Sequence, residues 1–171
     1  MINVGDQGAA GLLYATLRQR CETLSAAESC TGGRLGWEIT RIPGSSDVFW
    51  GSVVAYSDAA KTELAGVPQE LIRNHGAVSG EVAEALAAGI RSRSRTHWAV
   101  SITGIAGPTG GSPEKPVGTV WIGVSGPSGT GSRRLDATGD RETIRASAVA
   151  AALASLLDAM GVEGRGGGDG E

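Results

Sequence analysis

Segments typical of helices and segments typical of strands alternate along almost the whole chain. Runs rich in β-branched, aromatic or small apolar residues favour strands at 23–27, 48–56, 98–103, 119–125 and, more weakly, 133–137. Apolar spacing and capping residues favour helices at 9–20, 34–40, after Ser57-Asp58, and at 68–74, 81–95 and 141–160. Such alternation predicts a layered α/β sandwich in which helices cover both faces of a mixed sheet.

The size of the chain favours one domain. Its 171 residues, 40% of them hydrophobic, suffice for a single core without metal ions or disulfides. We expect this domain to span residues 1–160. The remaining segment, 161–171 (GVEGRGGGDGE), is Gly-rich and acidic, which predicts a disordered tail.

The charge and the polar composition exclude several classes of function. A net charge of −3 gives no basic field for a phosphate backbone, so we expect a small-molecule ligand and no nucleic-acid partner. The absence of a long apolar run and of a secretory signal predicts a cytoplasmic protein with no membrane partner. Two His and two Cys residues show no metal-site spacing, so we expect no metal. The sequence also lacks a P-loop or dinucleotide-binding signature, and we expect no other cofactor.

Lysine is rare in this sequence. Of the 15 basic residues only Lys61 and Lys115 are lysines, and the others are arginines. A buried lysine can lose its proton and act as a base, whereas arginine stays charged. The retention of lysine therefore indicates positions where arginine would not serve, with chance survival as the alternative.

Three polar, Gly-rich clusters stand at the ends of expected strands, at 28–33, 56–61 and 103–108. Ligands of open α/β folds bind beyond strand ends, so we expect these clusters to meet in a site. In the first cluster Ser29 precedes a Gly-Gly turn that opens a helix. The backbone N–H groups of Thr31, Gly32 and Gly33 could hold an oxyanion there. The alternative is that the polar residues only cap the helix.

A serine nucleophile needs a base. His75 and His97 are poorly placed along the sequence for this role, and we expect both to be structural. Lys61 is the remaining candidate, because burial and a helix N-terminus would both lower its pKa. A Ser29–Lys61 dyad follows as a hypothesis, with Tyr56 either donating a hydrogen bond in the site or only packing.

Cys30 is an alternative nucleophile. We favour Ser29, because residues 29 and 30 of an extended segment would point to opposite faces and only one would face the cleft.

Two further segments are candidates for substrate contacts. The Gly-rich run at 103–111 contains neither the P-loop motif nor the dinucleotide-binding motif. Arg141 and Arg145 lie on one side of an expected helix start, which suits an anion clamp. Ion pairs within a solvated helix start are the alternative.

Several blocks of the sequence resemble one protein family. They are AESCTGG (27–33), PGSSDVFWGSVVAYSDAAK (43–61), GVP (66–68), HGAVS (75–79), TGIAGPTGG (103–111), EKPVGTVW (114–121) and GDRETIR (139–145). In these blocks the chain is similar to the C-terminal domain of the CinA competence/damage-inducible proteins, including its stand-alone form, nicotinamide-nucleotide amidohydrolase. One departure is Thr109, which stands where the family pattern has glycine.

The resemblance implies a three-layer α/β/α sandwich that forms dimers or larger oligomers. It implies hydrolysis of nicotinamide mononucleotide to nicotinic acid mononucleotide and ammonia, within pyridine-nucleotide salvage. By that analogy Ser29 is the nucleophile, Lys61 its base and Tyr56 a neighbour in the site. Substrate contacts are expected from residues of all the clusters: Thr31, Gly32, Gly33, Thr103, Gly104, Gly107 and Arg141.

The sequence contains no counterpart of the molybdopterin-binding-like domain of longer family members. We therefore expect a stand-alone amidohydrolase without the pyrophosphatase activity associated with that domain. The alternative is a non-catalytic nucleotide-binding or regulatory module, in which the same loops hold a ligand and Lys61 pairs with phosphate.

Overall fold

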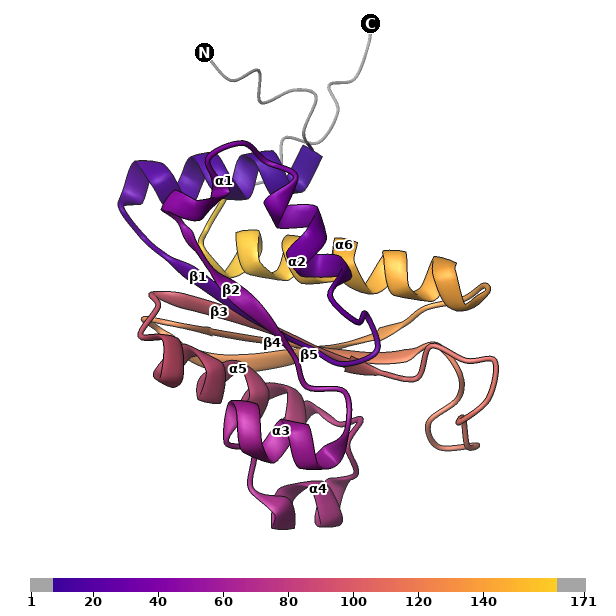
Figure 1. Cartoon of the computed structure of the whole chain (residues 1–171). Helices are drawn as coiled ribbons and strands as arrows, with labels where there is room; N and C mark the ends of the chain where they lie inside the picture. Colours follow the sequence, from indigo (N-terminus) through magenta and orange to yellow (C-terminus); the bar gives the residue numbers. More distant parts are fainter. Residues whose placement is uncertain (1–7, 163–171) are drawn as a thin grey trace, which may run out of the picture.

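A mixed sheet forms the centre of the fold in the computed structural model, which describes residues 8–162 (Figure 1). Its five strands lie in the order β2-β1-β3-β4-β5. They are β1 (Leu24–Glu28), β2 (Phe49–Val54), β3 (Trp98–Gly104), β4 (Thr119–Gly126) and β5 (Gly129–Asp136). β1 pairs in parallel with β2 and β3, whereas β4 runs antiparallel to β3 and β5.

Helices cover both faces of this sheet (Figure 1). On one face lie α1 (Gly8–Arg20), α2 (Arg34–Thr40) and α6 (Arg141–Ala159), and on the other α3 (Asp58–Ala65), α4 (Gln69–His75) and α5 (Gly80–Ser94). A 3-10 turn at Ser45–Asp47 leads into β2. The architecture is the three-layer α/β/α sandwich expected from the sequence.

Each helical layer packs on the sheet through its own apolar core. On one side α1 and α6 bury Leu13, Leu17, Ala148 and Leu156, and on the other α5 buries residues that include Leu86. The central strands β1 and β3 are buried almost throughout, because helices cover both of their faces. This explains why β1 (LSAAE) lacks the alternation of polar and apolar residues that half-buried strands show.

One strand is longer than the sequence pattern indicates. We expected residues 133–137, whereas β5 begins at Gly129, after a turn at Pro127 and Ser128. Its first residues are small or polar and exposed, so local β propensity is weak. They form a strand because they pair with β4, beginning with Gly129, which lies opposite Gly126.

Residues 1–7 and 163–171, which include most of the expected tail, lie outside the described part of the chain. Within residues 8–162, no helix is both long enough and apolar enough to cross a membrane.

The topology brings the three polar clusters to one edge of the sheet. Because β1, β2 and β3 are parallel, their carboxyl ends at Glu28, Val54 and Gly104 lie at the same edge. β4, antiparallel to β3, begins there, and α6 follows the end of β5 there. The loop 105–118 joins β3 to β4 at this edge, which is therefore where a site can form.

Candidate active site

A cavity of about 290 Å³ lies at the carboxyl edge of the parallel strands. Its walls come from all three polar clusters and from the start of α6. The lining residues are Ser29, Cys30, Tyr56, Asp58, Lys61, Ala77, Val78, Thr103, Gly104, Ile105, Ala106, Gly107, Thr109, Gly110 and Arg141. Two larger hollows, of about 480 and 400 Å³, contain neither Ser29 nor Lys61, so the chemistry of the walls rather than volume identifies the candidate site.

Ser29 stands in the turn that connects β1 to α2. It is 7% exposed, and its backbone N–H donates to the carbonyl of Ile102 at 2.9 Å, which ties the turn to β3. The chain then passes through Gly32 and Gly33, at φ of +59° and +96°, a conformation that favours glycine. The two glycines therefore permit the sharp turn that leaves Ser29 at the cavity wall.

The expected oxyanion-binding groups are only partly in place. The Gly32 N–H donates to the carbonyl of Ser29 at 3.1 Å, and the Gly33 N–H donates to the Glu28 carboxylate at 3.0 Å. The expectation that these two N–H groups are free for substrate is therefore wrong, and neither glycine nor Thr31 lines the cavity. Cys30 does line it, and its backbone N–H donates to no other residue within 8–162.

Glu28 organises this turn, a role not expected from the sequence. Its fully buried carboxylate accepts the N–H groups of Gly33, Leu35 and Gly36 at 2.8–3.0 Å and the Ser52 hydroxyl at 2.7 Å. The helix α2 begins at a glycine without a side-chain cap, so Glu28 satisfies its first backbone donors instead. An acidic residue at the end of an otherwise uncharged strand, with every residue buried, was the signal in the sequence.

Replacing Glu28 by glutamine is expected to lower the free energy of unfolding by about 3 kcal/mol. All four partners of the carboxylate are donors, so an amide NH₂ would face donors in either orientation. Urea unfolding of the wild type and Glu28→Gln measures the loss. Ser52→Ala is the matched control, because it removes one donor and leaves three, and a Glu28→Gln protein no less stable than this control would contradict the assigned role.

Lys61 is buried in the cavity wall, one turn inside α3. It is 2% exposed, its Nζ donates to the Tyr56 carbonyl at 3.2 Å, and Asp58 Oδ1 lies 3.6 Å away. Ser57 caps the helix as expected, accepting the Ala60 N–H at 3.1 Å. Burial lowers the pKa of Lys61, and the Asp58 carboxylate opposes this shift. The site thus combines a hydroxyl with an amine whose loss of a proton is facilitated.

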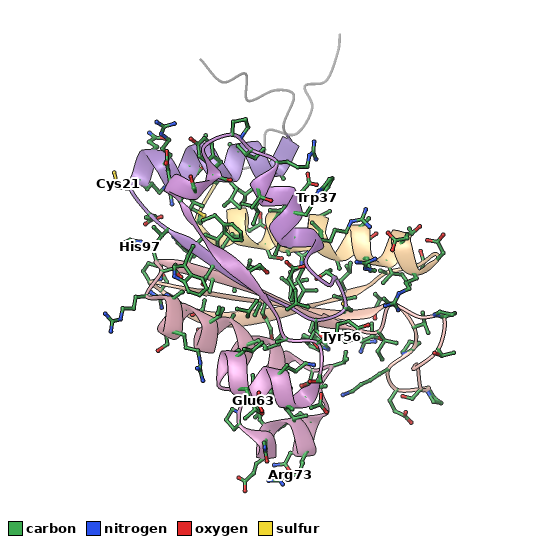
Figure 2. The ribbon with its side chains drawn as sticks, in the orientation of Figure 1. Cys21, Trp37, Tyr56, Glu63, Arg73 and His97 are labelled. Atoms are coloured by element: carbon green, nitrogen blue, oxygen red, sulfur yellow. The ribbon has the colours of Figure 1, made fainter. Side chains whose placement is uncertain are left out.

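Arg141 connects two parts of the cavity rim. Its Nη1 donates to the Gly107 carbonyl at 2.7 Å and its Nη2 donates to the Tyr56 hydroxyl at 3.2 Å. Tyr56 is 58% exposed, and Figure 2 shows it near the end of the sheet opposite Cys21 and His97. Tyr56 is therefore a rim residue and not a core packing residue.

Arg145 does not join Arg141 in an anion clamp. Its Nη2 donates to the Thr31 carbonyl at 2.8 Å, its Nη1 pairs with Glu142, and it does not line the cavity. One guanidinium group thus supports the cavity rim, while the other supports the turn that follows Ser29.

Both Ser29 and Cys30 line the cavity, which corrects the expectation that only one of them would. Residues 29–33 form a turn rather than an extended strand, so the alternation of faces does not apply to them. Burial raises the pKa of the Cys30 thiol to about 11. The thiol is therefore protonated near neutral pH, and a protonated thiol is a poor nucleophile.

If the chain hydrolyses an amide, as the resemblance implies, we expect Cys30→Ala to retain turnover, because the substitution removes the thiol but keeps the backbone N–H. The measurement is the rate of ammonia release by Cys30→Ala and by wild-type protein treated with iodoacetamide, each compared with the untreated wild type. Loss of turnover in a folded Cys30→Ala protein would make the thiol the nucleophile.

The remaining expected residues fix the loops around the cavity. The Thr103 hydroxyl donates to the Ala77 carbonyl at 2.8 Å, and Gly104 leaves no room for a side chain beside Val120. Lys115 Nζ donates to the His75 carbonyl at 2.7 Å, which links the loop 105–118 to the end of α4. This contact gives Lys115 a structural role.

Neither histidine lines the cavity. His97 accepts the Thr23 N–H at 3.0 Å at the far end of the sheet, and His75 pairs with the exposed Glu81. Within the described residues, no three His, Cys, Asp or Glu side chains are grouped so that they could hold a metal ion.

Comparison with known sequences gives one family. The sequence model of the CinA C-terminal domain matches residues 6–160. A CinA-like protein of Synechocystis sp. is 52% identical over 132 residues, which are 77% of this chain and 32% of that protein. A CinA-like protein of Gemmatimonas aurantiaca is 48% identical over 159 residues, 93% of this chain and 37% of that protein. The chain spans about a third of the length of the curated relatives it matches.

Solved structures agree with this result. The competence/damage-inducible protein CihA of Agrobacterium tumefaciens is 37% identical with a TM-score of 0.85, covering 89% of this chain and 93% of that one. A CinA superfamily protein of Escherichia coli is 31% identical with a TM-score of 0.86, covering 93% of this chain and 92% of that one.

Proposed function

The chain belongs to the CinA C-terminal domain family, and from this premise we propose that it hydrolyses the carboxamide of a pyridine nucleotide. The proposed substrate is nicotinamide mononucleotide, and the products are nicotinic acid mononucleotide and ammonia. The observation that carries the proposal is that Ser29 shares one cavity with a buried lysine, Lys61, whose pKa burial lowers. A hydroxyl beside a neutral amine is the arrangement that activates a serine nucleophile without histidine.

In the proposed first half-reaction, Ser29 Oγ attacks the amide carbon while Lys61 Nζ takes the hydroxyl proton. The carbonyl oxygen becomes an oxyanion, for which the Cys30 N–H is the available donor at the cavity wall. Collapse of the tetrahedral intermediate breaks the C–N bond. Lys61 returns the proton to the leaving nitrogen, ammonia departs, and the acyl group remains on Ser29.

In the second half-reaction, water attacks the acyl ester and Lys61 takes a proton from it. The C–Oγ bond then breaks, the proton returns to Ser29, and the carboxylic acid leaves. Every proton moves between the substrate, water, Ser29 and Lys61, so the cycle balances without a redox partner. Arg141 and the Tyr56 hydroxyl, both at the rim, are the groups we propose for the polar ribose or phosphate of the substrate.

The test is ammonia release from nicotinamide mononucleotide by the purified wild-type chain, with the product acid identified by mass spectrometry. Stoichiometric ammonia and nicotinic acid mononucleotide are the expected result. Binding of the same nucleotide to the wild-type chain is measured in parallel by calorimetry. Binding without turnover would favour the alternative function, a non-catalytic nucleotide-binding or regulatory module.

A further inference from the structure

Asp58 is the acidic partner of Lys61. It is the first residue of α3, and its Oδ1 lies 3.6 Å from Lys61 Nζ, one turn along the same helix. The two side chains differ sharply in environment, since that of Lys61 is 3% exposed and that of Asp58 is 63% exposed. Within residues 8–162, no other carboxylate lies within 4 Å of this amine.

We propose that Asp58 is a positioning residue for Lys61: its carboxylate holds the ammonium at the cavity wall and sets the pH at which Lys61 becomes a base. The proposal rests on the proposed function, in which Lys61 accepts a proton from Ser29. Within residues 8–162 the ammonium has one hydrogen-bond acceptor, the Tyr56 carbonyl, so removal of the Asp58 ion pair would leave it with that single partner.

The charges around Lys61 determine the direction of the effect. Burial lowers the pKa of Lys61 and Asp58 raises it. The other titratable side chains that act on it are Cys30, which is neutral near pH 7 because burial raises its pKa to about 11, and the rim residue Tyr56. Loss of the Asp58 charge therefore lowers the pKa of Lys61 further, and the neutral amine forms at a lower pH.

The chain allows a direct measurement, because it contains only two lysines. Growth with ¹³C,¹⁵N-lysine gives two side-chain NMR signals, which Lys115→Arg assigns. In Asp58→Asn we expect the titration midpoint of Lys61 to move down by roughly half a pH unit, the size suited to a pair with one exposed partner. The signal of Lys115, bound to the His75 carbonyl, should not move.

Glu63→Gln is the matched control, since Glu63 lies on the same helix, is exposed (labelled in Figure 2) and forms no ion pair with Lys61. An unchanged Lys61 midpoint in Asp58→Asn, or an equal shift in Glu63→Gln, would overturn the proposal.

Kinetics give a second readout. In Asp58→Asn the acid limb of the pH profile of kcat/KM should move to lower pH by the same amount. The pH-independent value of kcat should fall, because the amine is held less firmly. Asp58→Glu, which keeps the charge, should restore the limb. A wild type without turnover would refute the proposed function, and the NMR titration would still decide whether Asp58 controls Lys61. If Asp58 had a purely structural role, Asp58→Asn would change the stability of the protein but would leave unchanged the NMR titration midpoint of Lys61 and the midpoint of the kcat/KM profile.

Discussion

Ser29→Ala is expected to reduce kcat for ammonia release from nicotinamide mononucleotide by on the order of 10⁴-fold or more, with little change in nucleotide affinity. The substitution removes only the hydroxyl that would attack the amide carbon. The backbone N–H of Ser29, which binds the Ile102 carbonyl, remains, and so does the Glu28 network behind the turn. Steady-state kinetics and calorimetric binding on the same preparation separate the two quantities.

The neighbouring substitution Cys30→Ala is the control for Ser29→Ala, because both residues line the cavity and both are buried. A Ser29→Ala protein that keeps more than a few per cent of wild-type kcat would show that another group attacks the substrate. Acid-quenched wild-type enzyme should carry the acyl group on the peptide that contains Ser29, and this peptide should be unmodified in the variant.

The second large effect is expected for Lys61→Arg, which should lose about 10²- to 10⁴-fold in kcat. Arginine keeps the positive charge but cannot act as a base near neutral pH. Because Lys61 is almost fully buried, Lys61→Met is needed as a second variant that fits the apolar part of the site without the amine. Both variants should show a loss of this size, and Lys115→Arg, which alters the only other lysine of the sequence, should keep wild-type kcat.

Activity of Lys61→Arg near the wild-type value would exclude Lys61 as the base and require another group in that role. The double variant Ser29→Ala/Lys61→Arg should be no slower than Ser29→Ala alone, since a nucleophile and its base act as a unit. The wild-type pH profile gives an independent check. Burial lowers the pKa of Lys61, the active form is the neutral amine, and so kcat/KM should rise with pH through a midpoint below that of ordinary lysine.

Local sequence patterns were sufficient for most of the fold. Ser57 and Ser79 each accept the N–H three residues later, so two helix starts follow from short-range chemistry. The alternation of strand and helix segments indicated the three layers, because few arrangements bury the apolar faces of both the strands and the helices. The start of β5 was missed, since Gly129 and its neighbours become a strand only by pairing with β4.

Short-range sequence features pointed to the two central residues of the candidate site. Ser29 and Lys61 were identifiable because each is a chemically distinctive residue at a strand end or helix start, and parallel strands bring such ends to one edge. The placement of Thr103 and Arg141 at the same cavity follows from the same topology.

The contacts made by the groups around these two residues depend on the packing of the whole molecule. The Gly32 N–H donates to a carbonyl within the turn, and the Gly33 N–H donates to the Glu28 carboxylate. Arg141 donates to the Tyr56 hydroxyl, 85 residues away in the sequence. Each backbone N–H has a single hydrogen to donate, and the acceptor that it finds depends on how the chain folds around it, as where Ser52 of β2 donates to the Glu28 carboxylate behind the turn. Which donor meets which acceptor is therefore a property of the packed molecule.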